Sequence, residues 1–195
     1  LAVGTVGGQP SAAAEAAAAG ALRAVLADCL LAGGLLVEAL DRLDAAASRS
    51  AALRGATVAV AVLDTRSGKV EQARRGHLPA LMSGPGAAGA LHGPLDDTAG
   101  GPLGVGAHRG SPRTDVLEPG GLLLLHAAGP APGHAPASTR LHTLLTGSNE
   151  LWPPPPTDAD PHDPTGSSTA MDVFATRLID RVGGSAPVKV DIRVL

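Results

Sequence analysis

Apolar residues recur at helical spacing through residues 12–48, after a short apolar segment at residues 1–10 that predicts a strand running into a glycine turn. The alanine-rich segment 12–32 predicts a helix with an inward stripe formed by Leu22, Val25, Leu26, Cys29 and Leu30. Gly33 and Gly34 end this helix, and residues 35–48 predict a second one. Its inward positions are Leu36, Leu40 and Leu43, and its charged positions, interpreted as a solvated face, are Glu38, Asp41, Arg42 and Asp44.

The period then changes to two, which is typical of strands. Residues 57–63 and 69–74 flank the turn 64–68 and predict a β-hairpin. Four consecutive leucines at 122–125 follow a Pro-Gly-Gly turn and predict a strand buried on both faces. Further short elements are predicted as a strand at 80–82, a loop at 96–100, a compact turn at 101–105 and a strand at 113–117. We expect the strand 113–117 to pair with the leucines, so that the middle of the chain forms an antiparallel meander.

The last third of the chain predicts a helix at 139–145, a helix at 171–182 and a closing strand at 188–195. Glycine, proline and small polar residues indicate flexible segments near 83–100, 130–138 and 147–169. The run Trp152-Pro-Pro-Pro-Pro156 is interpreted as part of a linker, with a polyproline ligand for another domain as the alternative. The order of elements predicts sheet on sheet with helical cover.

Composition narrows the class of protein. A chain of 195 residues is about one domain long, and we expect a single domain over residues 1–195. The net charge of −3 and the scarcity of aromatic residues argue against nucleic acid as a partner. The single cysteine, Cys29, is interpreted as a buried apolar residue and allows no disulfide framework. Without a long apolar run or a basic leader, we expect no membrane contact and a cytoplasmic location.

Three stretches resemble the metal-dependent protein phosphatases of type 2C, in the bacterial SpoIIE/RsbU branch. Arg75-Gly-His-Leu-Pro79 is similar to that branch's Asn-Ala-Gly-His-Pro-Pro segment, and Gly101-Pro-Leu-Gly-Val105 to its Pro-Pro-Leu-Gly turn. Leu117-Glu-Pro-Gly-Gly-Leu-Leu-Leu-Leu125 is similar to the strand before its Tyr-Thr-Asp-Gly. The resemblance implies an α+β fold, a four-layer α/β/β/α sandwich of mostly antiparallel sheets with two Mn²⁺ or Mg²⁺ ions at one end. The chain opens directly with a strand, so we expect an excised piece without the family's N-terminal strands.

The positions that match the family's metal ligands do not carry carboxylates. Thr5 stands at the aspartate position of the Gly-Asp-Val segment, and Ala128 at that of the Tyr-Thr-Asp-Gly. Ala186 and Pro187 stand where the family has an Asp-Asp pair. Since hard divalent cations take oxygen ligands, the resemblance implies no metal site and no catalytic residues here.

Other acids and histidines offer no replacement site. Asp96 and Asp97 are interpreted as loop residues, Asp115 as a strand-edge charge and Asp191 as an outward strand residue. His126, His134 and His142 lie eight residues apart, without the short pairings of zinc sites, and His77 belongs to a turn whose role in the family is structural.

Three functional hypotheses remain open. The preferred one is a pseudophosphatase that binds no cofactor and acts as a regulatory domain on a phosphoprotein or regulatory protein of bacterial signalling. The first alternative is an active Mn/Mg-dependent protein serine/threonine phosphatase with relocated ligands, acting on a phosphorylated anti-anti-sigma-type partner. The second is an inactive fragment. The sequence predicts no oligomeric state.

Overall fold

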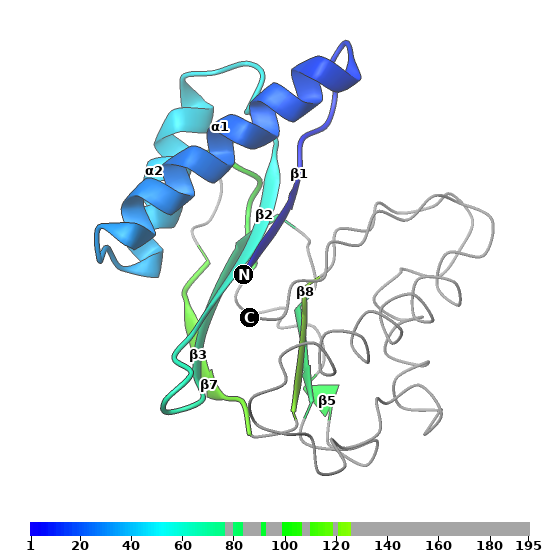
Figure 1. Cartoon of the computed structure of the whole chain (residues 1–195). Coiled ribbons are helices and arrows are strands. Elements are labelled where there is room, and N and C mark those ends of the chain that lie inside the picture. The colour runs from blue at the N-terminus through cyan, green and yellow to red at the C-terminus, as the bar shows by residue number, and fades with distance from the viewer. Residues whose placement is uncertain (77–79, 84–90, 93–98, 107–109, 119–120, 126–195) are drawn as a thin grey trace, which may run out of the picture. The chain divides into compact units, whose positions relative to one another are not determined.

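A computed structural model describes residues 1–76, 80–83, 91–92, 99–106, 110–118 and 121–125 (Figure 1). The chain divides into two compact units, one of residues 1–79 and 95–116 and the other of residues 80–94 and 117–195. The predicted helices at 139–145 and 171–182, the strand at 188–195 and the flexible segments at 130–138 and 147–169 lie outside the described residues. The single-domain organisation therefore stays a prediction.

The first unit carries both predicted helices, with bounds within a residue of those expected. Helix α1 spans Ala12–Leu31 and is capped by Ser11, whose hydroxyl accepts a hydrogen bond from the Ala14 amide at 3.2 Å. Helix α2 spans Leu36–Ser48. Between them, Gly33 takes a φ of +78°, a conformation that glycine adopts without steric cost.

The main sheet lies in this unit and has the order β1-β2-β3-β6, with β7 also paired to β3. Its strands are β1 (Ala2–Thr5), β2 (Thr57–Leu63), β3 (Lys69–Arg75), β6 (Ala99–Gly100) and β7 (Arg113–Val116). The predicted hairpin is confirmed, because β2 and β3 pair antiparallel from Val58↔Arg75 to Leu63↔Val70. Antiparallel pairing also joins β1 to β2 and β7 to β3 (Figure 1). The predicted α+β class with mostly antiparallel sheets is confirmed.

Two pairings differ from the predicted meander. The strand Arg113–Val116 pairs with β3 and not with the leucine run, and two of its polar residues lie opposite polar residues, in the register pairs Glu71↔Thr114 and Gln72↔Arg113. The leucines instead pair with the equally apolar strand at residues 80–83. Ala99–Gly100, predicted as loop, forms β6 and runs parallel to β3. The order of the strands along the chain therefore did not predict which strands pair.

The second unit contains a small sheet of order β5-β4-β8, formed by Leu91–His92, Ala80–Ser83 and Leu122–Leu125. Strand β4 pairs antiparallel with β8 from Ala80↔Leu125 to Ser83↔Leu122. Adjacent strand residues point to opposite faces, and both Leu124 and Leu125 are buried. Burial on both faces is therefore confirmed for this end of the leucine run.

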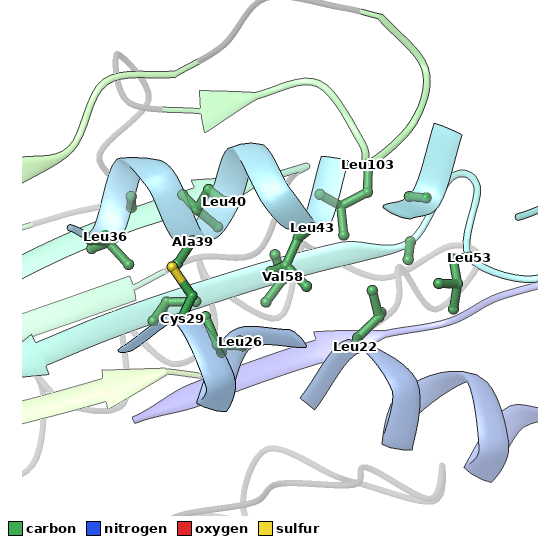
Figure 2. Close-up of a cluster of buried hydrophobic side chains, with 14 of the residues drawn as sticks. Leu22, Leu26, Cys29, Leu36, Ala39, Leu40, Leu43, Leu53, Val58 and Leu103 are labelled. Carbon is green, nitrogen blue, oxygen red and sulfur yellow. The ribbon is translucent and has the colours of Figure 1, made fainter. Parts of the chain in front are cut away.

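The core of the first unit forms where the helices cover one face of the main sheet. Figure 2 shows side chains from α1, α2, β2 and the turn at 101–105 gathered in one cluster. Its fully buried leucines include Leu40, Leu43 and Leu103. Cys29 is 1% exposed and belongs to the same cluster, which confirms its interpretation as a buried apolar residue.

The loop of the β2–β3 hairpin carries an acid-sensitive contact. The Asp64 carboxylate accepts hydrogen bonds from the Ser67 hydroxyl at 2.6 Å and the Arg66 amide at 3.0 Å, and these lower its pKa from the usual 3.8. Because the folded-state pKa is depressed, the stabilising contribution is present above the unfolded pKa and is lost as the pH falls through the folded pKa.

We therefore expect Asp64→Ala to unfold at lower urea concentration than wild type at about pH 6, with the difference shrinking below the ordinary Asp pKa of about 4. Urea midpoints measured across this range test the prediction. A difference that stays constant into strong acid would contradict it.

Candidate functional site

The end of the main sheet where β1 stops and β2 begins contains Thr5, which the sequence resemblance predicts to be the first of the family's ligand positions. Thr5 is the last residue of β1 and lies opposite Thr57, the first residue of β2. The two side-chain hydroxyl oxygens are 2.7 Å apart and share a hydrogen bond. Thr5 therefore presents a neutral hydroxyl that is already engaged with its cross-strand neighbour.

The backbone around this pair is closely packed. A Cβ on Gly4 would lie 2.7 Å from the Thr57 carbonyl oxygen, so only glycine fits beside β2 at this point. Gly76 follows β3 with a φ of +82°, and a Cβ there would collide with the Thr57 side chain. Gly76 also donates its amide to the Gly100 carbonyl at 2.8 Å. Thr57 is thus flanked by the end of β1 and the end of β3 and remains partly exposed.

The turn at 101–105 is anchored to α2 beside this sheet end. Leu103 is fully buried in the core cluster, and its amide donates to the Ala56 carbonyl at 2.9 Å. The next amide, that of Gly104, donates to the Asp44 carboxylate at 2.8 Å. Asp44 was predicted to lie on a solvated face, and the structure corrects this, because its carboxylate supplies an acceptor that the turn needs.

Asp41, one turn earlier on α2, has a side chain that is 39% exposed, which agrees with the predicted solvated face, but it also makes a contact with a buried side chain. Its carboxylate lies 3.4 Å from the guanidinium of Arg75, whose side chain is 3% exposed. The same guanidinium donates to the Gly110 carbonyl at 3.3 Å. A buried cation needs a nearby anion, and Asp41 is the acid that α2 offers. The three-residue spacing of Asp41 and Asp44, which places both on one side of the helix, was the signal that sequence reasoning missed.

We expect Asp44→Ala to lower the free energy of unfolding by about 1–2 kcal/mol, because a charged acceptor of a partly buried amide is lost. Asp28→Ala is the matched control, since the Asp28 side chain is 83% exposed, and it should change stability by less than about 0.5 kcal/mol. Urea denaturation of both variants measures the difference. Equal effects of the two substitutions would contradict the anchoring role of Asp44.

Asp115 is the only one of the four acids weighed as replacement ligands that lies within the described residues. Its carboxylate lies 2.8 Å from Arg113 Nε, accepts a second bond from Arg113 Nη2 at 2.9 Å, and accepts one from Gln72 Nε2 at 3.1 Å. The side chain is 16% exposed. Asp115 therefore lies in a strand, forms an ion pair with Arg113 and accepts a hydrogen bond from the buried Gln72 side chain. These contacts explain its presence as a structural residue.

Most other predicted site positions lie outside the described residues. These are Ala128, Ala186 and Pro187 among the ligand positions, Asp96, Asp97 and Asp191 among the acids, and His77, His126, His134 and His142 among the histidines. Within the described part of the chain, no group of three or more His, Cys, Asp or Glu side chains is close enough to hold a metal ion.

The chemistry of the described sheet end does not fit a divalent-cation site. Mn²⁺ and Mg²⁺ bind through several hard oxygen ligands, usually including carboxylates, whereas Thr5 and Thr57 offer two neutral hydroxyls bonded to each other. A threonine nucleophile would need a base within hydrogen-bond reach, and the described partner of Thr5 is another hydroxyl. This arrangement can stabilise a strand pair, and it supplies neither a metal ligand nor an activated nucleophile.

Comparisons with known proteins agree with the resemblance found in the sequence. The family described as Stage II sporulation protein E (SpoIIE) matches residues 2–130. Among solved structures, the chain is similar to the RsbU and RsbW domains of Rv1364c from Mycobacterium tuberculosis, with 25% identity and a TM-score of 0.73. The match covers 97% of this chain and 48% of that one, so the chain spans about half of its structural relative. The likeness confirms the predicted phosphatase-like fold.

Two further findings concern curated relatives and membrane-spanning helices. The search of curated proteins gave no significant match. Among the helices that the structure describes, none combines the length and apolar character needed to cross a bilayer.

Proposed function

The chain belongs to the SpoIIE family of PPM-type phosphatase domains, and on this basis we propose that it is a pseudophosphatase, a signalling domain that binds a regulatory protein without a metal centre. The observation that carries the proposal is the state of Thr5. The sequence resemblance implies that Thr5 occupies a family aspartate position, and its hydroxyl shares a hydrogen bond with that of Thr57 at 2.7 Å. Ala128, Ala186 and Pro187, at the other matched positions, have no side-chain oxygen that could bind a cation.

The proposed role is regulatory because a phosphatase fold without its metal ions keeps its surfaces. The solved relative supports a signalling context, since it holds an RsbU and an RsbW domain in one chain. We propose that the partner is a regulatory protein of bacterial signalling, such as a phosphorylated anti-anti-sigma-type protein, and that binding takes place in the cytoplasm. Recognition then depends on surface shape and charge and requires no Mn²⁺ or Mg²⁺.

Calorimetric titration with Mn²⁺, combined with hydrolysis of a phosphoserine peptide, tests the proposal. We expect no saturable binding in the micromolar range and no hydrolysis above the rate of the buffer. Binding together with hydrolysis would overturn the pseudophosphatase and favour the active phosphatase with relocated ligands. Repeating the titration with Asp96→Asn, Asp97→Asn, Asp115→Asn and Asp191→Asn would then show which acids carry the ion.

A further inference from the structure

The turn between α1 and α2 lies at one end of the helical layer (Figure 1). Two solvent-exposed leucines flank this turn. Leu31, the last residue of α1, is 88% exposed, and Leu35, the residue before α2, is 61% exposed. Among the large apolar residues that the structure describes as exposed, these two are the most exposed leucines and lie four positions apart. We call Leu31 and Leu35, with their acidic neighbours Asp28 and Glu38, the turn patch.

The turn patch is held rigidly by its backbone. The amides of Ala32 and Gly34 donate to the Asp28 and Cys29 carbonyls at 3.2 and 3.0 Å. A Cβ on Gly34 would lie 2.7 Å from Cys29 Sγ, so the turn is packed directly against the core. The Leu35 amide donates to the Glu38 carboxylate at 3.1 Å. The leucines therefore stand on an ordered turn, and little backbone entropy would be lost on binding.

Leucine is an unfavourable choice at these positions for folding alone. Leu35 occupies the N-cap of α2 and makes no side-chain cap bond, where Ser, Asp or Asn would stabilise the helix by about 1 kcal/mol. Leu31 gains almost nothing from burial in the described structure. Covering each side chain with a partner would recover roughly 1.5–3 kcal/mol. We infer that these two leucines, exposed on an ordered turn, form the apolar part of an interaction surface.

Charge around the leucines defines the kind of partner. Residues three apart on a helix are neighbours, so Asp28 flanks Leu31 and Glu38 flanks Leu35. The Asp28 side chain is 83% exposed. Its ion pair with Arg42, whose side chain is 60% exposed, is long, at 3.9 Å, and an exposed pair of this kind is weak enough for a partner's cation to compete with Arg42. The last turn of α1 has no basic residue to offset the negative end of the helix dipole.

We propose that the turn patch docks a basic amphipathic segment of the regulatory partner, with its apolar side chains on Leu31 and Leu35 and its Lys or Arg residues near Asp28 and Glu38. The inference deepens the proposed function, because it names the surface through which this domain binds a protein. Opposite charges would speed the encounter and set the orientation, and the leucines would supply most of the affinity.

A synthetic peptide that carries leucines at helical spacing and lysines elsewhere is the probe, and the same peptide with glutamate for lysine is its control. Fluorescence anisotropy of the labelled peptides against the whole chain, in EDTA, measures binding. We expect the lysine peptide to bind and the glutamate peptide to bind at least tenfold more weakly. Leu31→Ser combined with Leu35→Ser should weaken lysine-peptide binding about tenfold or more.

Val62→Ser combined with Val116→Ser is the matched control, because these valines are 41% and 62% exposed elsewhere on the unit. This pair should change affinity less than about twofold. Equal losses in the two double variants, or no binding of the lysine peptide, would overturn the proposal. A dimer in sedimentation velocity that is lost with Leu31→Ser and Leu35→Ser would overturn it too, since the patch would then serve a second copy. The EDTA keeps this test independent of the Mn²⁺ titration, so either proposal can fail without the other.

Discussion

Replacing Leu43 by alanine is expected to lower the free energy of unfolding by about 2–5 kcal/mol. Leu43 has no exposed surface and lies in the cluster where α2 meets the sheet and the buried Leu103 (Figure 2). The substitution removes apolar contacts from both and leaves a cavity that the surrounding backbone can only partly close. Because single domains are stable by only about 5–15 kcal/mol, the variant would lose a large share of its stability.

Leu31→Ala is the matched control for this prediction, since it makes the same chemical change on a side chain that is 88% exposed. It should alter stability by no more than about 0.5 kcal/mol. Urea denaturation followed by circular dichroism, with equal slopes for all three proteins, provides the comparison. If both variants lost the same amount, the covering of the sheet by α2 would be wrong.

The helices could be predicted closely because their signals are local. An alanine-rich segment, a serine cap and a glycine pair set the bounds of α1, and the apolar stripe identified Leu22, Leu26 and Cys29 as buried. The hairpin was equally predictable, since its alternating apolar and polar residues and its turn residues lie within one short segment. In each case the residues that determine the element are close together in the sequence.

Strand partners and charged contacts could not be predicted in the same way. The pairing of Arg113–Val116 with β3 joins residues more than forty positions apart in the sequence. The contact between the Gly104 amide and Asp44 joins residues 60 positions apart. Charged residues on a helix are usually exposed to solvent, so the sequence predicted a solvated face for Asp41 and Asp44. The need for those carboxylates arises only when the Arg75 guanidinium and an amide of the turn are brought beside them.

For Thr5, the sequence resemblance implies only that a carboxylate is missing, and this stays a prediction. The sequence could not reveal that the Thr5 hydroxyl shares a hydrogen bond with Thr57. That bond depends on the register of β1 against β2, which places the two threonines directly opposite each other. The turn patch could not be predicted from the sequence either, because the exposure of Leu31 and Leu35 depends on how the turn packs on Cys29.

Replacing Gly104 by alanine should lower the free energy of unfolding by roughly 2–5 kcal/mol, through two separate costs. The residue has a φ of +73°, which is unfavourable for any residue with a Cβ by about 1–2 kcal/mol. The added Cβ would also lie 2.7 Å from the carbonyl carbon of Ala47 and 2.9 Å from the amide nitrogen of Ser48. Both atoms belong to the backbone of the last turn of α2, so relief requires the turn to move away from the helix and from Asp44.

Gly55→Ala separates the two costs. Gly55 has a φ of +81°, but apart from its own atoms and those of its two chain neighbours, no described atom lies within 4 Å of an added Cβ. This variant should therefore show the conformational cost alone, roughly 1–2 kcal/mol, and Gly104→Ala should be clearly less stable. Thermal and urea unfolding of the two variants beside wild type give the comparison. If Gly55→Ala were as unstable as Gly104→Ala, the close packing of the turn on α2 would contribute nothing to stability. The anchoring of this turn beside the sheet end that contains Thr5 would then lose its support.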